Sequence, residues 1–278
     1  MTSQRPSRTL PRLSNPPPPP RLAAVEAFTG FLQHLGEMSL MVAGAVASLF
    51  RRPFEGREIV RQIEKLGVAS VGIVFVTSVF IGMVMSAQFA FGLQKFGGME
   101  YTGRVVALSF ARELAPTLTA VIVGGRIGAG MAAELGSMAV TEQIDAIQAL
   151  GADPLKKLVA PRLLAAILVL PILGSFALVL GFSGAMFITD WQFNIPAPFF
   201  LGSALNTITM MDYIAGVVKT PFFGAVIAIV ACHFGMSTKG GTAGVGNNTT
   251  KTVVVTSIAI LILDLFLTKL VFWIWSYL

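Results

Sequence analysis

The sequence predicts an all-α integral membrane protein in which an N-terminal interfacial amphipathic helix precedes five transmembrane helices. The composition is the first reason. Of 278 residues, 54% are hydrophobic and 12% are charged, whereas soluble domains carry roughly 25% charged residues. The second reason is the length of the apolar runs, because a bilayer core of about 30 Å needs about 20 apolar residues in a helix. Lipid must therefore cover much of this chain.

Four apolar runs clearly meet that length, and a fifth is only slightly weaker. We expect the spans near residues 67–93, 104–134, 157–189, 213–236 and 252–277. In the second span, Pro116 removes a backbone hydrogen bond and is expected to bend the helix.

Residues 23–52 differ from these runs. They are apolar in stripes but carry Glu26, His34 and Glu37, a pattern that favours a helix lying in the cytoplasmic interface rather than crossing the membrane. In a six-span alternative, residues 23–50 would cross, and one terminus would change sides.

The first 22 residues contain the run Pro16 to Pro20. They are expected to form a disordered, Pro-rich cytoplasmic tail. Residues 23–278 are then a single membrane domain.

The net charge of +6 does not indicate nucleic-acid binding, because nine of the twenty Lys and Arg precede residue 66, outside the long apolar runs. Basic residues beside spans mark cytoplasmic loops. The N-terminus is therefore expected in the cytoplasm and the C-terminus outside, where the last aromatic residues fit an interfacial belt. The residues behind this orientation are Lys156, Lys157, Arg162, Lys239 and Lys251 for the basic loops, and Trp273, Trp275 and Tyr277 for the belt.

Four charged residues inside the predicted spans are candidates for function: Arg112, Glu113, Lys219 and Asp264. A charge in a span costs about 2.5–3.5 kcal/mol on insertion scales. Arg112 and Glu113 are adjacent and point about 100° apart on a helix, so each needs a partner on another helix. We predict one buried network of these four residues, with the pairings open. A purely structural role, in which the ions only hold helices together, is the alternative.

The polar segment 138–155 lies between the second and third spans. Thr141 is expected to cap a short helix and Gly151 to end it, after which Asp153-Pro154 starts the next helix. The apolar side of the short helix carries Ile144, Ile147 and Leu150, and the other sides carry Glu142, Gln143, Asp145 and Gln148. Facing the cytosol, this helix can dock in a groove of a partner or pack on the membrane surface.

Two further stripes each leave alternatives open. Small residues recur every four positions at Gly124, Gly128, Ala132 and Gly136, which suits close helix packing either within one subunit or across a dimer. An apolar stripe follows the first span at Met85, Phe89, Gly92, Leu93 and Phe96. It can face lipid, fill the core, or line a cavity for acyl chains.

No catalytic group is expected. The run from Gly235 to Gly241 begins like a P-loop but has Gly241 where the lysine must stand. His34 and His233 are far apart in the sequence, and we predict no metal site. The single cysteine, Cys232, excludes an internal disulfide. Active transport by this chain would need energy from elsewhere.

Residues 110–162 read FARELAPTLTAVIVGGRIGAGMAAELGSMAVTEQIDAIQALGADPLKKLVAPR. This run, with VFIGMVMSAQ at 79–88 and LILDLFLTKL at 261–270, resembles the MlaE/YrbE permease family. The resemblance spans roughly residues 25–278 and leaves the Pro-rich tail unexplained. It implies a homodimeric permease of an ABC transporter in the bacterial inner membrane. Cytoplasmic ATPase subunits would bind ATP and Mg, and this chain would carry no cofactor.

The resemblance also implies a substrate and roles for the candidate residues. The complex would move phospholipids, or sterols in some relatives, between the inner membrane and a periplasmic ring of MCE-domain proteins, which supports outer-membrane lipid asymmetry. The ATPase coupling helix would be residues 138–150, with Glu142, Gln143 and Asp145 as contacts. The family's charged positions would be the four named above, and its lipid cavity would lie near Met85, Gly92, Leu93 and Phe96. The rival hypotheses are a proton-coupled secondary transporter using Glu113 and Asp264, and a membrane scaffold that transports nothing.

Overall fold

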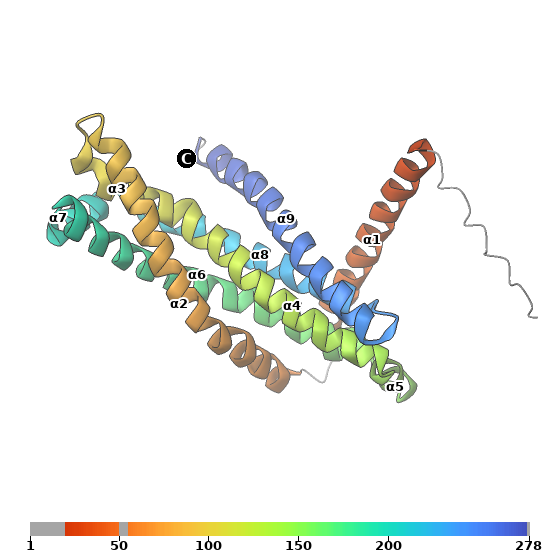
Figure 1. Ribbon diagram of the computed structural model, residues 1–278. Helices are drawn as coiled ribbons and strands as arrows, with labels where there is room; N and C mark the ends of the chain where they lie inside the picture. Colours follow the sequence, from red (N-terminus) through yellow and green to blue (C-terminus); the bar gives the residue numbers. More distant parts are fainter. Residues whose placement is uncertain (1–19, 50–54, 277–278) are drawn as a thin grey trace, which may run out of the picture.

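The computed structural model describes residues 20–49 and 55–276, and every element in these two ranges is a helix (Figure 1). The α-helices are α1 (Pro20–Leu49), α2 (Gly56–Gln94), α3 (Thr102–Ser109), α4 (Thr119–Val140), α5 (Gln143–Ala149), α6 (Ala160–Phe193), α7 (Ala197–Leu205), α8 (Met210–Met236) and α9 (Gly241–Trp275). Three short segments join them: the 3₁₀ turn η1 (Met99–Tyr101) and the π-helical turns η2 (Phe110–Leu118) and η3 (Leu155–Val159).

Five continuous helical segments are long and apolar enough to cross a membrane, in the number and order predicted. They are Gly56–Gln94, Met99–Val140, Leu155–Phe193, Met210–Met236 and Gly241–Trp275. Each span is longer than its apolar run, because polar residues at the ends continue the helix instead of ending it. Within the described residues, α1 is not among these segments.

Some sequence predictions lie outside the described residues. These are the tail up to residue 19, residues 50–52 at the end of the interfacial segment, and Tyr277. The predicted boundary of the tail at residue 22 is wrong, since α1 already begins at Pro20. A proline suits the first helical position because its missing N–H has no helical partner there.

The long helices α2, α4, α6 and α8 lie side by side and form a bundle (Figure 1). The short helices α3 and α7 pack together at one end, called here the α7 end, and α5 lies at the other, the α5 end. The last helix, α9, starts at the α5 end and packs on α4 and α8. The first, α1, contacts the bundle near its own C-terminus, and its other end projects away.

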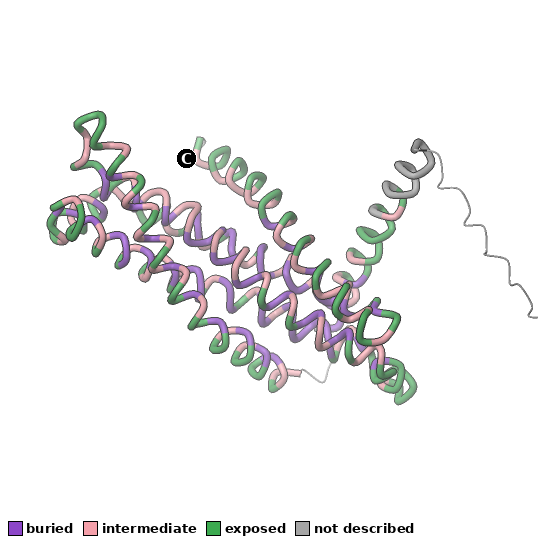
Figure 2. The backbone as a smooth tube through the Cα atoms, in the orientation of Figure 1, coloured by how far each residue is buried: buried purple, intermediate pink, exposed green. Residues whose placement is uncertain are grey.

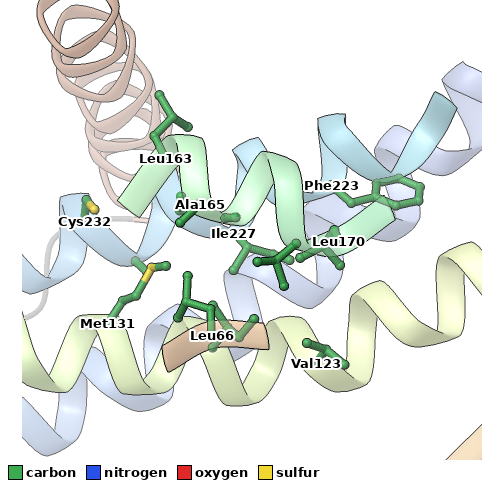
Figure 3. Packing of buried hydrophobic residues seen from close by; sticks show 14 of the residues in the cluster. Leu66, Val123, Met131, Leu163, Ala165, Leu170, Phe223, Ile227 and Cys232 are labelled. Carbon is green, nitrogen blue, oxygen red and sulfur yellow. The ribbon is translucent and has the colours of Figure 1, made fainter. Parts of the chain in front are cut away.

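The larger core lies among α2, α4, α6, α8 and α9. Figure 3 shows how Leu66, Met131, Leu170 and Ile227 meet there from four different helices. Small residues let the helix backbones approach closely. At the tightest place, a Cβ built on Gly82 of α2 would collide with the carbonyl oxygen of Gly181 of α6.

The small-residue stripe of α4 packs inside the chain. A Cβ at Gly124 would meet Ile227 of α8 at 2.9 Å and Ile260 of α9 at 3.3 Å, and one at Gly128 would meet Thr252 at 3.4 Å. Of the two alternatives left open by the sequence, this face of α4 serves packing within one subunit.

Many large apolar side chains are exposed on the outside of the bundle, and Figure 2 shows exposed residues along α2 and α9. On α9, only Thr252, Thr256 and Ile260 are buried. Large side chains such as Leu261 and Phe266 are exposed. An apolar surface of this extent is not stable in water, so lipid or another protein must cover it.

Candidate functional site

The residues Arg112 and Glu113 lie on η2, a π-helical stretch inside the second span. Pro116 lies in the same stretch and cannot donate a backbone hydrogen bond to the residues before it. Single π-helical turns inside α-helices are frequent at functional sites. The predicted bend at Pro116 therefore takes the form of a widened helical turn that carries two charged residues.

Glu113 and Asp264 meet at Lys219, whose side chain is 2% exposed. The Lys219 ammonium donates to Glu113 Oε2 at 2.8 Å and to Asp264 Oδ1 at 3.2 Å, and so joins the second, fourth and fifth spans. It also donates to the hydroxyl of Thr268 at 2.7 Å, and that hydroxyl lies 3.1 Å from Glu113 Oε1. The structure thus brings three of the four predicted residues together, and Thr268 joins them.

Arg112 does not belong to this cluster through its side chain, so the predicted four-residue network is wrong at this position. Its guanidinium donates from Nε to Asp212 Oδ1 at 2.6 Å and lies over the ring of Trp275, 4.6 Å from Cζ to the ring centroid. The neighbours on η2 diverge, as their 100° separation requires. Trp275, predicted as a belt residue, therefore also contacts a buried ion pair.

Asp212 is a functional candidate that sequence reasoning missed. The span predicted from apolar length starts at residue 213, whereas Asp212 lies in the first turn of α8 and its side chain is 2% exposed. Its carboxylate accepts from the backbone N–H of Thr209 at 2.7 Å, while Thr209 Oγ1 accepts from Asp212 N at 3.3 Å. This reciprocal capping is signalled by Thr-x-x-Asp before an apolar run, and that signal was available in the sequence.

The two ion groups form one charged layer inside an apolar bundle. Lys219, Glu113 and Asp264 carry one positive and two negative formal charges, and Arg112 with Asp212 adds one of each. Since isolated buried charges are very costly, the layer holds its helices in a fixed arrangement.

The predicted short helix between the second and third spans is present as α5. Of the three predictions for the helix ends, two are correct. Gly151 follows the helix with φ +75°, and Asp153 Oδ1 accepts from Leu155 N at 2.9 Å where the next helix begins. Thr141 is not the cap, because its hydroxyl donates back to Ser137 O at 2.8 Å. Glu142 occupies the N-cap position with φ 58° and without a side-chain hydrogen bond to the helix.

On α5, Ile144 is buried against α4, and Ile147 packs beside it on the same core. Glu142, Gln143 and Asp145 are exposed. Beside them lies a groove of about 430 Å³ between α5 and the loop that joins α8 to α9. It is lined by Ala139, Val140, Glu142, Ile144, Asp145, Met236, Thr238, Lys239, Gly240 and Gly241. The α5 helix is thus held to the bundle by its packed isoleucines, and its outer surface is charged.

A third ion group holds the α5 end together. Glu134 of α4 lies 2.7 Å from Lys65 Nζ of α2 and 3.2 Å from Arg162 Nη2 of α6. Arg162 also donates to Leu158 O at 2.7 Å. The base of α5 is therefore tied to two neighbouring helices.

The predicted lipid-cavity residues divide into two groups. Met85 and Phe89 pack on a second core cluster around Phe110 and Phe200. Gly92 and Leu93 are half-buried near the end of α2, and Phe96 is largely exposed just beyond it. In one chain the stripe therefore runs from the core to the outer surface.

The two histidines, which are far apart in the sequence, are neighbours in the structure. His34 of α1 and His233 of α8 lie together, with His34 Nδ1 2.9 Å from His233 Nε2. Separation by 199 residues hides such a contact from any local pattern.

Long apolar helices around buried ion pairs define a multi-pass, all-α membrane protein, as the sequence predicted. Within that class the chain belongs to the MlaE permease family, because the family model described as permease MlaE matches residues 59–270. The resemblance seen in the sequence is thereby confirmed.

Relatives cover most of the chain. A probable ABC transporter permease protein of Synechocystis is 41% identical over 216 residues, which are 78% of this chain and 82% of the relative. One from Rickettsia typhi is 38% identical over 242 residues, 87% of this chain and 93% of the relative. The chloroplast protein trigalactosyldiacylglycerol 1 of Arabidopsis thaliana is 35% identical over 233 residues, which are 84% of this chain and 67% of the relative.

Proposed function

We propose that this permease is the membrane subunit of an ABC transporter that moves phospholipids or related lipids. The observation that carries the proposal is the arrangement of α5 at the end of the bundle. Its Ile144 is buried against the bundle, and Glu142, Gln143 and Asp145 are exposed. Family membership and the ABC transporter permeases among its relatives support a subunit without its own enzymatic activity. An ATPase partner would supply the energy.

The ATPase is proposed to bind at the α5 end. The groove beside α5 offers acidic Glu142 and Asp145 opposite Lys239, so a partner can be held by both shape and charge. Because α5 is tied through α4 to α2 and α6 by Glu134, a push on α5 would move the bundle rather than bend one loop. Closure of two ATPases would in this way change the lipid site.

Lipid as the substrate is supported by two facts. The plant relative carries the name of a lipid, trigalactosyldiacylglycerol. The stripe from Met85 to Phe96 offers apolar contacts that continue from the core to the surface. We place this stripe at a cavity formed with a second copy of the chain, and we propose that the exposed face of α9 is covered by that copy or by lipid.

The remaining assignments follow the family. We propose the bacterial inner membrane as the location, with the α5 end in the cytoplasm and the α7 end toward a periplasmic ring of MCE-domain proteins. In this role the transporter would maintain the lipid asymmetry of the outer membrane. The basic residues Lys156, Lys157 and Lys239 at the α5 end support this orientation by the positive-inside rule.

Co-purification in mild detergent tests the ATPase partner. Tagged protein should elute with an ATPase subunit and with phospholipid, and Glu142→Lys with Asp145→Lys should abolish ATPase elution while leaving the protein folded. The matched control is Asp190→Lys, which reverses the charge of an exposed residue near the C-terminal end of α6. An intact complex with normal lipid-stimulated ATP turnover in the double variant would contradict the proposal.

The orientation is tested with single cysteines in a Cys232→Ala background. Gln143→Cys on α5 should react with an impermeant thiol reagent only from the cytoplasmic side, and Trp191→Cys near the α7 end only from the periplasmic side. Both side chains are exposed. Labelling of position 143 from the periplasm alone would overturn the scheme.

A further inference from the structure

The histidine pair is part of a three-residue group that nothing in the proposed transport cycle uses. His34 and Glu37 come from α1, and His233 comes from the last turn of α8. One ligand atom of each lies within 4.8 Å of the others. His34 Nδ1 and His233 Nε2 are 2.9 Å apart, and Glu37 Oε2 is 3.9 Å from each of them.

Their chemistry is that of a transition-metal site. Two imidazole nitrogens and one carboxylate oxygen form a common ligand set for Zn²⁺, with bonds of about 2.0–2.2 Å. Ligands at that distance from a tetrahedral ion are separated by about 3.3 Å. The nitrogens would part by about 0.4 Å and the carboxylate would approach by about 0.6 Å, which side-chain rotation of exposed residues can supply.

The surroundings hold the ligands toward one point. His34 and Glu37 are three residues apart and therefore share one face of α1. Gln33 Nε2 donates to Glu37 Oε1 at 3.2 Å and leaves Oε2 facing the histidines, as outer-shell partners of metal ligands do. The two imidazoles cross at 80°, and Phe234 packs against both rings.

We propose that His34, Glu37 and His233 bind one Zn²⁺ or a similar divalent transition-metal ion, with water completing the coordination. His233 is 6% exposed and fixed by the bundle, whereas the His34 and Glu37 side chains are 54% and 49% exposed. The ion can therefore enter from solvent and join α1 to the end of α8. Because the N-terminal part of α1 projects away from the bundle, such an ion would fix the position of α1 against α8.

Metal binding to the purified full chain tests this, with any polyhistidine tag removed. Equilibrium dialysis against Zn²⁺ should give one ion per chain, and Co²⁺ should give the absorption of a low-symmetry site with nitrogen ligands. Zn²⁺ should also raise Tm by at least about 2 °C, because it binds the folded state. These readouts are independent of lipid transport, so they can fail while the proposed function stands.

Three variants assign the ligands. His34→Ala, Glu37→Gln and His233→Ala should each raise the Kd for Zn²⁺ at least about 100-fold, because loss of an outer-shell partner alone costs about 10–100-fold. His34 and Glu37 are exposed, so their variants test the site even if His233→Ala fails to fold. The control is Cys232→Ala, which removes the buried thiol next to His233 and should bind as the parent does. Absence of Zn²⁺ binding, or unchanged binding by His34→Ala and Glu37→Gln, overturns the proposal.

Discussion

Lys219 donates its ammonium group to the backbone carbonyl oxygen of Arg112 at 3.2 Å. In an α-helix, that carbonyl would accept from the residue four positions on, which here is Pro116 and has no N–H. The same ammonium binds Glu113 and Asp264. One buried cation thus binds both a backbone carbonyl of the π-helical stretch and two carboxylates.

Replacement of Lys219 by methionine should destabilise the protein strongly. Breaking a buried pair by removing one partner costs about 3–5 kcal/mol, and here two carboxylates lose their cation. Thermal unfolding in detergent should show the loss, and Asp264→Asn added to Lys219→Met should recover part of it. The control is Lys269→Met, at an exposed lysine of α9. Its free energy of unfolding should stay within about 0.5 kcal/mol of that of the parent. Equal stability of the two single variants would contradict a structural role for Lys219.

A double-mutant cycle should detect the pair formed by Arg112 and Asp212. Arg112→Gln and Asp212→Asn should couple by about 1–3 kcal/mol, since charged partners in contact are not additive. The free energy of unfolding of the four proteins gives the coupling. Arg112→Gln combined with Asp145→Asn should be additive to within about 0.5 kcal/mol, because Asp145 is an exposed residue of α5 at the opposite end of the bundle. A coupling near zero in the first cycle would show that the contact contributes nothing.

Two glycines of α2 should respond in opposite ways to alanine. At Gly82 a methyl group collides with the carbonyl oxygen of Gly181, and overpacking of this kind costs about 1–3 kcal/mol. At Gly72 nothing lies within 4 Å of the added carbon, and alanine should stabilise the helix by about 0.5–1 kcal/mol. Tm measurements on both variants check this. The same sign of change at the two positions would refute the close approach of α2 and α6.

Glycine at position 142 should stabilise the fold. Glu142 has φ 58°, a left-handed conformation that costs non-glycine residues about 1–2 kcal/mol. Glu142→Gly removes that cost, whereas Gln143→Gly in the helix next to it should destabilise by about 1 kcal/mol. If the carboxylate binds the ATPase, Glu142→Gly should raise Tm and still weaken ATPase binding. A lower Tm for Glu142→Gly than for the parent would contradict the backbone assignment.

The local features of this fold could be predicted from the sequence, because they obey local rules. Apolar length located the five spans, Gly151 ended α5, and Asp153 with Pro154 began the next helix. Lys219 was also recognised as a residue in need of a partner, since a charge in an apolar run must be paired.

The long-range features could not be predicted. The fourth span predicted from apolar length alone starts at residue 213, so it leaves out Asp212 and the pairing of Asp212 with Arg112. The contact between His34 and His233 depends on where α1 meets α8, which no periodicity encodes. The π-helical turn follows from packing around Pro116, and Pro116 by itself indicated only a bend.

The π-helical stretch Phe110–Leu118 has a consequence for chain length. A π turn accommodates one more residue than an α turn, and each residue of an α-helix corresponds to a rotation of about 100°. The wider turn takes up its extra residue locally, so the helices before and after it keep the relative orientation that one regular α-helix would give them. Deleting one residue from this stretch would therefore restore a regular α-helix, whereas deleting one residue from α4 would rotate the parts on either side against each other by about 100°. Homologous chains should accordingly tolerate a one-residue deletion within Phe110–Leu118 better than one within α4.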